Sequence, residues 1–164
     1  MRRLLDVTLF LGERGLAFRG ETQKIGQSNN GNFLGILELL SHYDPVLEKH
    51  LSKVKESQQS GQRMQVHYLS SDIQNEFIAC CAQHVRSVIL KEREAAKYYS
   101  VIVDATPDSA HMEQTTFILR YVSLDNNSKY EVKERFLEFA DCNEKTGAAI
   151  GELICYTLLM LLQQ

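Results

Sequence analysis

The chain has 164 residues, of which 44% are hydrophobic and 24% are charged, and its formal net charge is -3. This composition is typical of a soluble globular protein with room for one sizeable core, and it excludes a largely disordered chain. Residues 1–97 carry 13 Lys and Arg against 11 Asp and Glu, whereas residues 98–164 carry 5 against 10, so we expect DNA binding to be weak or absent.

The first predicted elements are helices separated by polar loops. Apolar residues at helical spacing predict an amphipathic helix over residues 2–14, and the Gly- and Asn-rich stretch 20–32 predicts a surface loop. A short helix follows over 33–43. Asp44 and Pro45 are typical of an N-cap and a first helical position, so a third helix starts there. Residues 57–66 predict a second polar loop.

The strongest helical pattern begins at Ser71 and fades over residues 91–97. Ser71 and Gln74 have the spacing of a capping box. Cys80 and His84 lie one helical turn apart, which is half of a possible zinc site. Because no second half is evident, we expect a buried Cys beside a His at the edge of the core.

The pattern then changes to that of strands. The run 98–104 is typical of a central strand and is followed by a predicted hairpin of residues 115–123 and 130–140. Phe117, Leu119 and Tyr121 are expected to share one face. From about residue 143 the chain reads as a helix that is apolar on most sides.

This order predicts a mixed α/β fold with two regions. Residues 1–97 form a helical region, and residues 98–164 form the β-β-β-α start of a ribonuclease H-like domain. In that fold a fourth strand pairs with the first, and the sequence stops before it. We therefore expect a domain truncated before the fourth strand.

Five segments, which begin at residues 16, 29, 68, 98 and 132, carry a resemblance to a known family: LAFRG, NNGNFLGILELLSHYDPVLEKHL, YLSSDIQNEFIACCAQHVRSVIL, YYSVIVDATPDSAHMEQTTFILRYV and VKERFLEFADCNEKTGAAI. In order and spacing they resemble the hAT-like transposase domain of zinc finger MYM-type protein 1-like proteins, which is domain of unknown function 4371.

The resemblance implies a metal-dependent DNA transposase ancestor. Such enzymes hold two Mg²⁺ or Mn²⁺ ions with Asp, Asp and Glu side chains. Asp104, which follows the apolar run 100–103, matches the first carboxylate, as a catalytic residue and a metal ligand. Ala105 and Pro107 depart from the family's usual Asp-Glu-Thr-Thr-Asp. The second Asp and the Glu would lie beyond the chain, so we expect no bound cofactor and no activity from Asp104 as it stands.

Several other readings of these residues remain open. Without the resemblance, Asp104 after a strand is most simply a turn or capping residue, and Asp108 is a turn former. Ser109 and His111 beside Asp108 have the residue types of a hydrolase triad, but near neighbours on one loop do not reach its geometry. The group Lys49, Lys53 and Lys55 is flanked by glutamates and reads as a solvated helix face.

Three functions therefore compete. The first is a truncated, catalytically inactive, transposase-derived protein. The second is a domesticated protein-interaction or chromatin-associated module, which would bind a partner or itself through the open sheet edge and the apolar last helix, with Leu153, Ile154, Leu158 and Leu161. The third is a fragment of an active DDE-type transposase.

The sequence also bears on the compartment. The apolar stretch near the start is broken by Asp6 and lacks a cleavage site, and the final apolar run is far shorter than the roughly 20 residues that a membrane span needs. The four cysteines include no C-x-x-C pair, and Cys80 and Cys81 are adjacent. We expect an intracellular protein without a membrane segment, and the resemblance implies the nucleus.

Overall fold

The computed structural model describes residues 1–61, 64, 66–107, 113–124, 128–141 and 146–162. Over this part of the chain the elements are α1 (Arg2–Glu13), α2 (Gly31–Ser41), α3 (Pro45–Ser60), α4 (Ser71–Ala95), β1 (Tyr99–Pro107), β2 (Glu113–Leu124), β3 (Tyr130–Asp141) and α5 (Gly147–Leu162). The fold is therefore mixed α/β, with helices followed by a three-stranded antiparallel sheet and a last helix, as predicted.

The chain divides into two compact units, Met1–Gln83 and His84–Gln164. The boundary falls inside α4, so the first part of this helix belongs to one unit and its last part to the other. The domain boundary expected from the sequence, between residues 97 and 98, stays a prediction.

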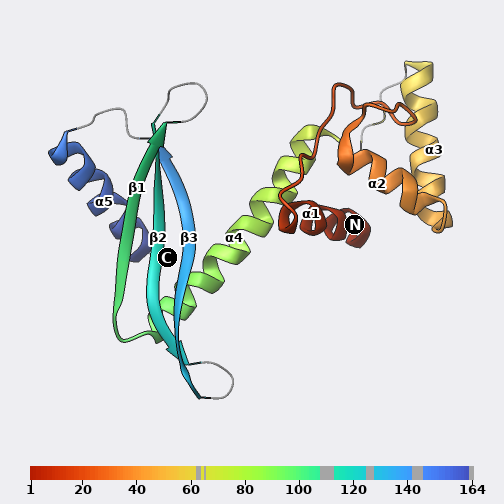
Figure 1. Ribbon diagram of the computed structural model, residues 1–164. Helices are drawn as coiled ribbons and strands as arrows, with labels where there is room; N and C mark the ends of the chain where they lie inside the picture. Colours follow the sequence, from red (N-terminus) through yellow and green to blue (C-terminus); the bar gives the residue numbers. More distant parts are fainter. Residues whose placement is uncertain (62–63, 65, 108–112, 125–127, 142–145, 163–164) are drawn as a thin grey trace. The chain divides into compact units, whose positions relative to one another are not determined.

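The first unit contains α1, α2 and α3 (Figure 1). These helices supply most of its apolar core. Each helix contributes residues three or four positions apart, which is the spacing of one helical face. These residues are Leu4, Val7 and Leu11 from α1, Phe33, Leu34 and Leu37 from α2, and Leu47, Leu51 and Val54 from α3. Burial of their side chains is the main source of stability for this unit.

Helix α3 is longer than the sequence suggested. Asp44 caps it as predicted, because its side chain accepts hydrogen bonds from the backbone N–H groups of Val46 and Leu47. The helix continues to Ser60, so the polar loop expected from residue 57 was placed too early. It ends at Gly61, whose φ of 70° is the left-handed conformation that terminates helices and that glycine adopts without strain.

The loop before α2 is anchored to the helices. The Ile25 N–H donates to Gln58 Oε1 at 3.0 Å, and Asn30, only 4% exposed, donates from Nδ2 to Glu38 Oε1 at 3.0 Å. The backbone segments at Gly20 and Gly31 pass so close to each other that a Cβ on either glycine would collide with backbone atoms of the other segment. The Gly- and Asn-rich composition is thus explained by close approach of the backbone as well as by exposure.

In the second unit the three strands lie side by side in the order β1-β2-β3, and both pairs are antiparallel (Figure 1). Strand β1 does not stop at Asp104, where the sequence suggested an end. It runs to Pro107, because Ala105 and Thr106 continue the antiparallel pairing with Thr115 and Gln114. Among the described strands β1 pairs with β2 alone, so it is an edge strand, and the expectation of a central strand is corrected.

One face of this sheet packs against helices. Phe117, Leu119 and Tyr121 alternate along β2 and are all buried, as expected from the sequence. They form one apolar cluster with the residues Ile89 and Leu90 of α4, Leu137 of β3, and the partly buried Leu153 and Ile154 of α5. Burial on this side fixes which residues of each strand point to the opposite side.

None of the described helices combines the length and the apolar character that crossing a membrane requires.

Candidate functional site on the open face of the sheet

Asp104 lies on the side of the sheet opposite the helices. In the register of the strands it pairs with Thr116 of β2, which in turn pairs with Phe139 of β3. Its side chain is exposed, and residues of the same strand on the same face are Ile102 and Thr106. We call the side of the sheet that carries Asp104 and Phe139 the open face.

Among the residues that the structure describes, the side chains beside Asp104 do not form a two-metal site. Its cross-strand neighbour Thr116 offers a hydroxyl group, and Phe139 and Ile102 offer no ligand atom. Divalent ions such as Mg²⁺ take several oxygen ligands, chiefly carboxylates. Within the described part of the chain no cluster of three or more His, Cys, Asp or Glu is placed to hold a metal ion. The role of Asp104 as a metal ligand stays a prediction.

Aromatic side chains are exposed on the open face. Phe136 is 48% exposed and Phe139 is 62% exposed, and their ring centroids are 4.8 Å apart. Strict alternation would put residues three positions apart on opposite faces. The register shifts by one residue opposite Phe117 and Ile118, and Leu137 is buried, so a β-bulge brings both phenylalanines to the open face.

Aliphatic and aromatic residues continue this surface toward the other end of the hairpin. These residues, on the same face in the register, are Val122 and Leu124 of β2 and Tyr130 and Val132 of β3, between 46% and 81% exposed. A cross-strand ion pair lies among them, with Arg120 Nη1 at 2.9 Å from Glu134 Oε1. The open face therefore combines a broad apolar surface with few charges.

The helix-packed face, in contrast, contains a closed polar network. The buried Tyr121 hydroxyl donates to Glu92 Oε2 at 2.5 Å, and Lys133 Nζ lies 3.3 Å from Glu92 Oε1. The hydrogen bond from Tyr121 is the main cause that lowers the pKa of Glu92, with Lys133 and Arg135 adding to it. Burial, with the Glu92 carboxylate beside it, raises the pKa of Tyr121. This network joins α4 to β2 and β3, and both carboxylate oxygens of Glu92 have partners in it.

The Cys80–His84 pair is not part of the core. Both side chains are exposed, so the expectation of a buried cysteine beside a core-edge histidine was wrong. The buried residues of α4 are instead Gln74 near its start and Ile89 and Leu90 near its end. The stretch between them supplies no fully buried side chain. The apolar pattern of this stretch therefore did not indicate burial of Cys80.

Of the other residues singled out in the sequence, some lie in the described part of the chain and some lie outside it. Lys49, Lys53 and Lys55 are exposed, as expected for a solvated helix face. Asp108, Ser109 and His111, which have the residue types of a triad, lie outside the described residues, as does Cys142. The side chains of Leu158 and Leu161 in α5 also lie outside the described part.

The open face was not identified from the sequence. A period of two runs from Tyr130 and Val132 to Phe136, but the bulge at Leu137 interrupts it before Phe139 is reached. The sequence pattern of the run RFLEF therefore did not differ from that of an ordinary strand with one buried face. An alternation that breaks by one residue between two phenylalanines is the signal that could have found this surface.

Known proteins provide one specific comparison. No solved structure matches the chain. The family model described as DUF4371, the ZMYM1/FAM200 RNase-like domain, matches residues 1–161. The three-stranded antiparallel sheet followed by a helix is consistent with an RNase-like domain, and the DUF4371 assignment predicted from the five sequence segments is confirmed. The chain belongs to the DUF4371 family.

Proposed function

We propose that this chain is an hAT-type, transposase-derived protein that functions as a protein-binding module and does not cleave DNA. The ancestry rests on the sequence resemblance, and the binding function rests on the open face. One observation carries the proposal: exposed side chains of Phe136, Phe139, Val122, Val132 and Tyr130 lie together on one side of a sheet whose other side is packed. Large exposed apolar patches mark interaction sites in soluble proteins.

The face is a better binding surface than the free edge of β1. A charged side chain and a proline near the end of an edge strand both discourage pairing with another strand. Asp104 and Pro107 are such residues, since Pro107 has no backbone N–H to donate. The partner is therefore expected to cover side chains of the sheet rather than to extend it.

The charges on this side indicate which partner fits. Asp104 is exposed beside the apolar residues, and Glu134 lies across from Arg120 on the same face. Residues 98–164 as a whole carry more acidic than basic side chains. An amphipathic element with an apolar stripe and flanking basic residues complements this surface, because opposite charges at the rim favour encounter and register. A second copy of the chain offers the apolar contact without the basic rim, so we expect it to bind this face more weakly, and only when no such partner is present.

The neighbours of Asp104 support the absence of catalysis. Phosphoryl transfer of this class needs two cations held by several carboxylates, which activate the attacking oxygen and stabilise the leaving one. Across the sheet Asp104 has a threonine and a phenylalanine beside it. The row that contains Asp104 thus contributes a hydroxyl group and apolar contact rather than a second carboxylate.

A plasmid-nicking assay tests the catalytic part of the proposal. Supercoiled DNA is incubated with the chain in Mg²⁺ or Mn²⁺, beside the variants Asp104→Ala and, as a matched control, Glu134→Ala. We expect all three proteins to leave the plasmid as intact as buffer does. Metal-dependent nicking by the unchanged chain and by Glu134→Ala, lost in Asp104→Ala, would show that Asp104 is a working ligand.

The resemblance also supports a nuclear location. A fluorescently tagged chain is expected to concentrate in the nucleus of the cells that express it. A tagged chain that is excluded from the nucleus contradicts this part of the proposal and leaves the binding surface untouched.

A further inference from the structure

The first unit contains a small apolar pocket between the start of α1 and the start of α3. Its volume is about 250 Å³, and it is lined by Met1, Arg3, Leu4, Val46, Leu47, His50 and Tyr68. Leu4 and Leu47 are buried and belong to the core, whereas Met1, Val46 and Tyr68 are exposed. The pocket therefore has an apolar wall that is continuous with the core and polar groups from Arg3, His50 and Tyr68.

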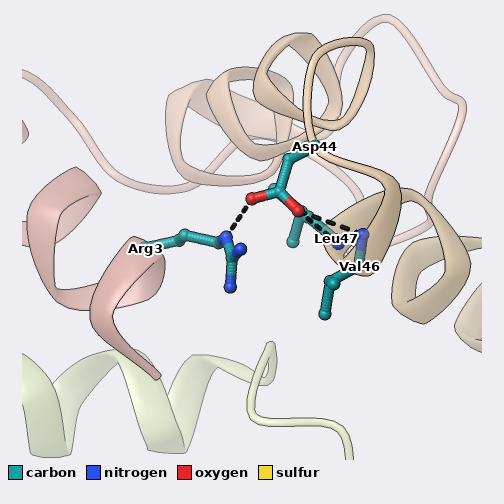
Figure 2. A network of polar contacts seen from close by, with 4 residues as sticks. All are labelled: Arg3, Asp44, Val46 and Leu47. Carbon is teal, nitrogen blue, oxygen red and sulfur yellow. Dashed lines mark hydrogen bonds and ion pairs between the residues drawn. The ribbon is translucent and has the colours of Figure 1, made fainter.

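The Arg3 guanidinium is held in place at this pocket (Figure 2). Asp44 Oδ1 accepts from the N–H groups of Val46 at 3.0 Å and Leu47 at 3.1 Å, and Asp44 Oδ2 pairs with Arg3 Nε. These donors, the Leu47 N–H first, lower the pKa of Asp44, so its carboxylate stays ionised. Among the described residues no partner is found for the two terminal nitrogens of Arg3, which leaves its fork of N–H donors available.

A strained residue stands at the rim of the same pocket. Tyr68 has a φ of 59°, a conformation that costs a non-glycine residue on the order of 1 kcal/mol. The loop around it is fixed, because His50 Nε2 lies 2.9 Å from the His67 carbonyl and the Leu69 N–H donates to His67 Nδ1 at 3.1 Å. Burial lowers the pKa of His67, with His50 adding to it, and this favours the neutral ring that accepts the bond.

We propose that this pocket binds an apolar carboxylate: a leucine- or phenylalanine-sized group in the cavity, with its carboxylate on the terminal nitrogens of Arg3. A cavity of about 150 Å³ holds a benzene ring, so the observed volume accommodates such a group together with its carboxylate. Guanidinium and carboxylate groups match in two-pronged geometry, and Asp44 already holds Arg3 in one orientation. Val46 and Leu47, which line the pocket, belong to the first turn of α3, where the positive end of the helix dipole lies.

Nuclear magnetic resonance of the ¹⁵N-labelled chain tests this inference. The protein is titrated with N-acetyl-leucine and, separately, with N-acetyl-leucinamide, which has the same apolar group but no charge. We expect N-acetyl-leucine to produce saturable shifts at the amides of Val46, Leu47 and Tyr68, and the amide to bind at least about tenfold more weakly, since a charge-assisted hydrogen bond is lost. No saturable shift at these amides, or equal binding of both compounds, overturns the proposal.

Two variants test whether the charge of Arg3 binds the carboxylate of the ligand. Arg3→Gln is expected to weaken N-acetyl-leucine binding at least about tenfold. Arg2→Gln removes the same charge from an exposed neighbour that does not line the pocket and is expected to bind like the unchanged chain. Equal loss in both variants contradicts a specific role for Arg3. If Arg3→Gln disturbs the fold, seen as shifts throughout the first unit, the comparison of acid and amide on the unchanged chain decides.

A third compound separates two sources of the ligand. In 4-methylpentanoate the apolar group and the carboxylate are kept, and the peptide-like amide is removed. Tighter binding of N-acetyl-leucine identifies the carboxyl terminus of a peptide, and tighter binding of 4-methylpentanoate identifies a free aliphatic acid. Because the pocket lies in the first unit and the open face in the second, this result stands or falls independently of the proposed function.

Discussion

The chemistry open to a single residue here depends on the side chains placed beside it. Asp104 and Glu92 are both acidic residues of the second unit, but their surroundings differ. Glu92 receives the hydroxyl of Tyr121 and the cation of Lys133, and its pKa is lowered as a result. Asp104 is exposed, opposite Thr116. Glu92 is thereby a structural carboxylate, a role that its position in the charged stretch 91–97 of the sequence did not reveal.

Replacement of Glu92 tests that structural role. Glu92→Gln removes the charge that receives the Tyr121 hydroxyl and pairs with Lys133, and we expect the free energy of unfolding to fall by about 1–3 kcal/mol. Glu94→Gln, an exposed neighbour on the same helix, is the matched control and is expected to change it by less than about 0.5 kcal/mol. Denaturant unfolding followed by circular dichroism measures both, and equal effects contradict the assigned network.

The lowered pKa of Glu92 also predicts a dependence on pH. Glu92 binds a proton less readily in the folded state than in the unfolded chain, where its pKa is near 4.5. The stabilisation is therefore fully present above pH 4.5 and is lost as the pH falls through the lower pKa of the folded protein. In Glu92→Gln this part of the acid destabilisation is expected to be absent, while Glu94→Gln retains it.

At the scale of elements, most helices and strands followed from local patterns in the sequence. Asp44 and Pro45 marked the start of α3, and the alternation of Phe117, Leu119 and Tyr121 marked the packed face of β2. The misplaced ends have physical causes. Helix α3 continued through Ser and Gln residues until Gly61 provided the left-handed turn, and β1 continued because β2 was long enough to pair with it.

The N-terminal cap of α4 also differs from the one that the sequence pattern predicted. Ser71 and Gln74 had the spacing of a capping box, but Ser70 lies at the cap, with its hydroxyl accepting from the Ile73 N–H at 3.4 Å. Gln74 is buried and donates to the Leu69 carbonyl at 3.1 Å. A one-residue difference in register changed the role of each polar side chain. Such differences depend on tertiary packing, which local spacing does not encode.

The cap of α3 gives a prediction at this scale. Asp44→Ala removes both the acceptor for the Val46 and Leu47 N–H groups and the partner of Arg3, and we expect a lower melting temperature. Asp44→Asn keeps an acceptor for the helix but loses the ion pair, so its melting temperature should lie between those of Asp44→Ala and the unchanged chain. Differential scanning calorimetry orders the three, and an Asn variant as unstable as the Ala variant contradicts a capping role.

At the scale of the whole molecule, the family assignment and the exposed sheet belong together. The chain belongs to a family described as RNase-like, and its second unit has a three-stranded sheet with one face packed by helices. Sequence patterns predicted the sheet and its packed face. They did not predict the open face, because a β-bulge after Phe136 shifts the alternation by one residue and brings Phe139 to the same side.

The most direct test of the central claim is light scattering with size-exclusion chromatography over a wide range of protein concentration. An apolar face that binds protein is expected to associate with itself when no partner is present, so the average mass of the unchanged chain should rise with concentration. The double variant Phe136→Glu with Phe139→Glu should remain monomeric at every concentration, whereas Tyr43→Glu, which changes an exposed aromatic residue of the first unit, should behave like the unchanged chain. A chain that stays monomeric throughout, or a double variant that associates as strongly as the unchanged chain, contradicts the open face as the binding surface.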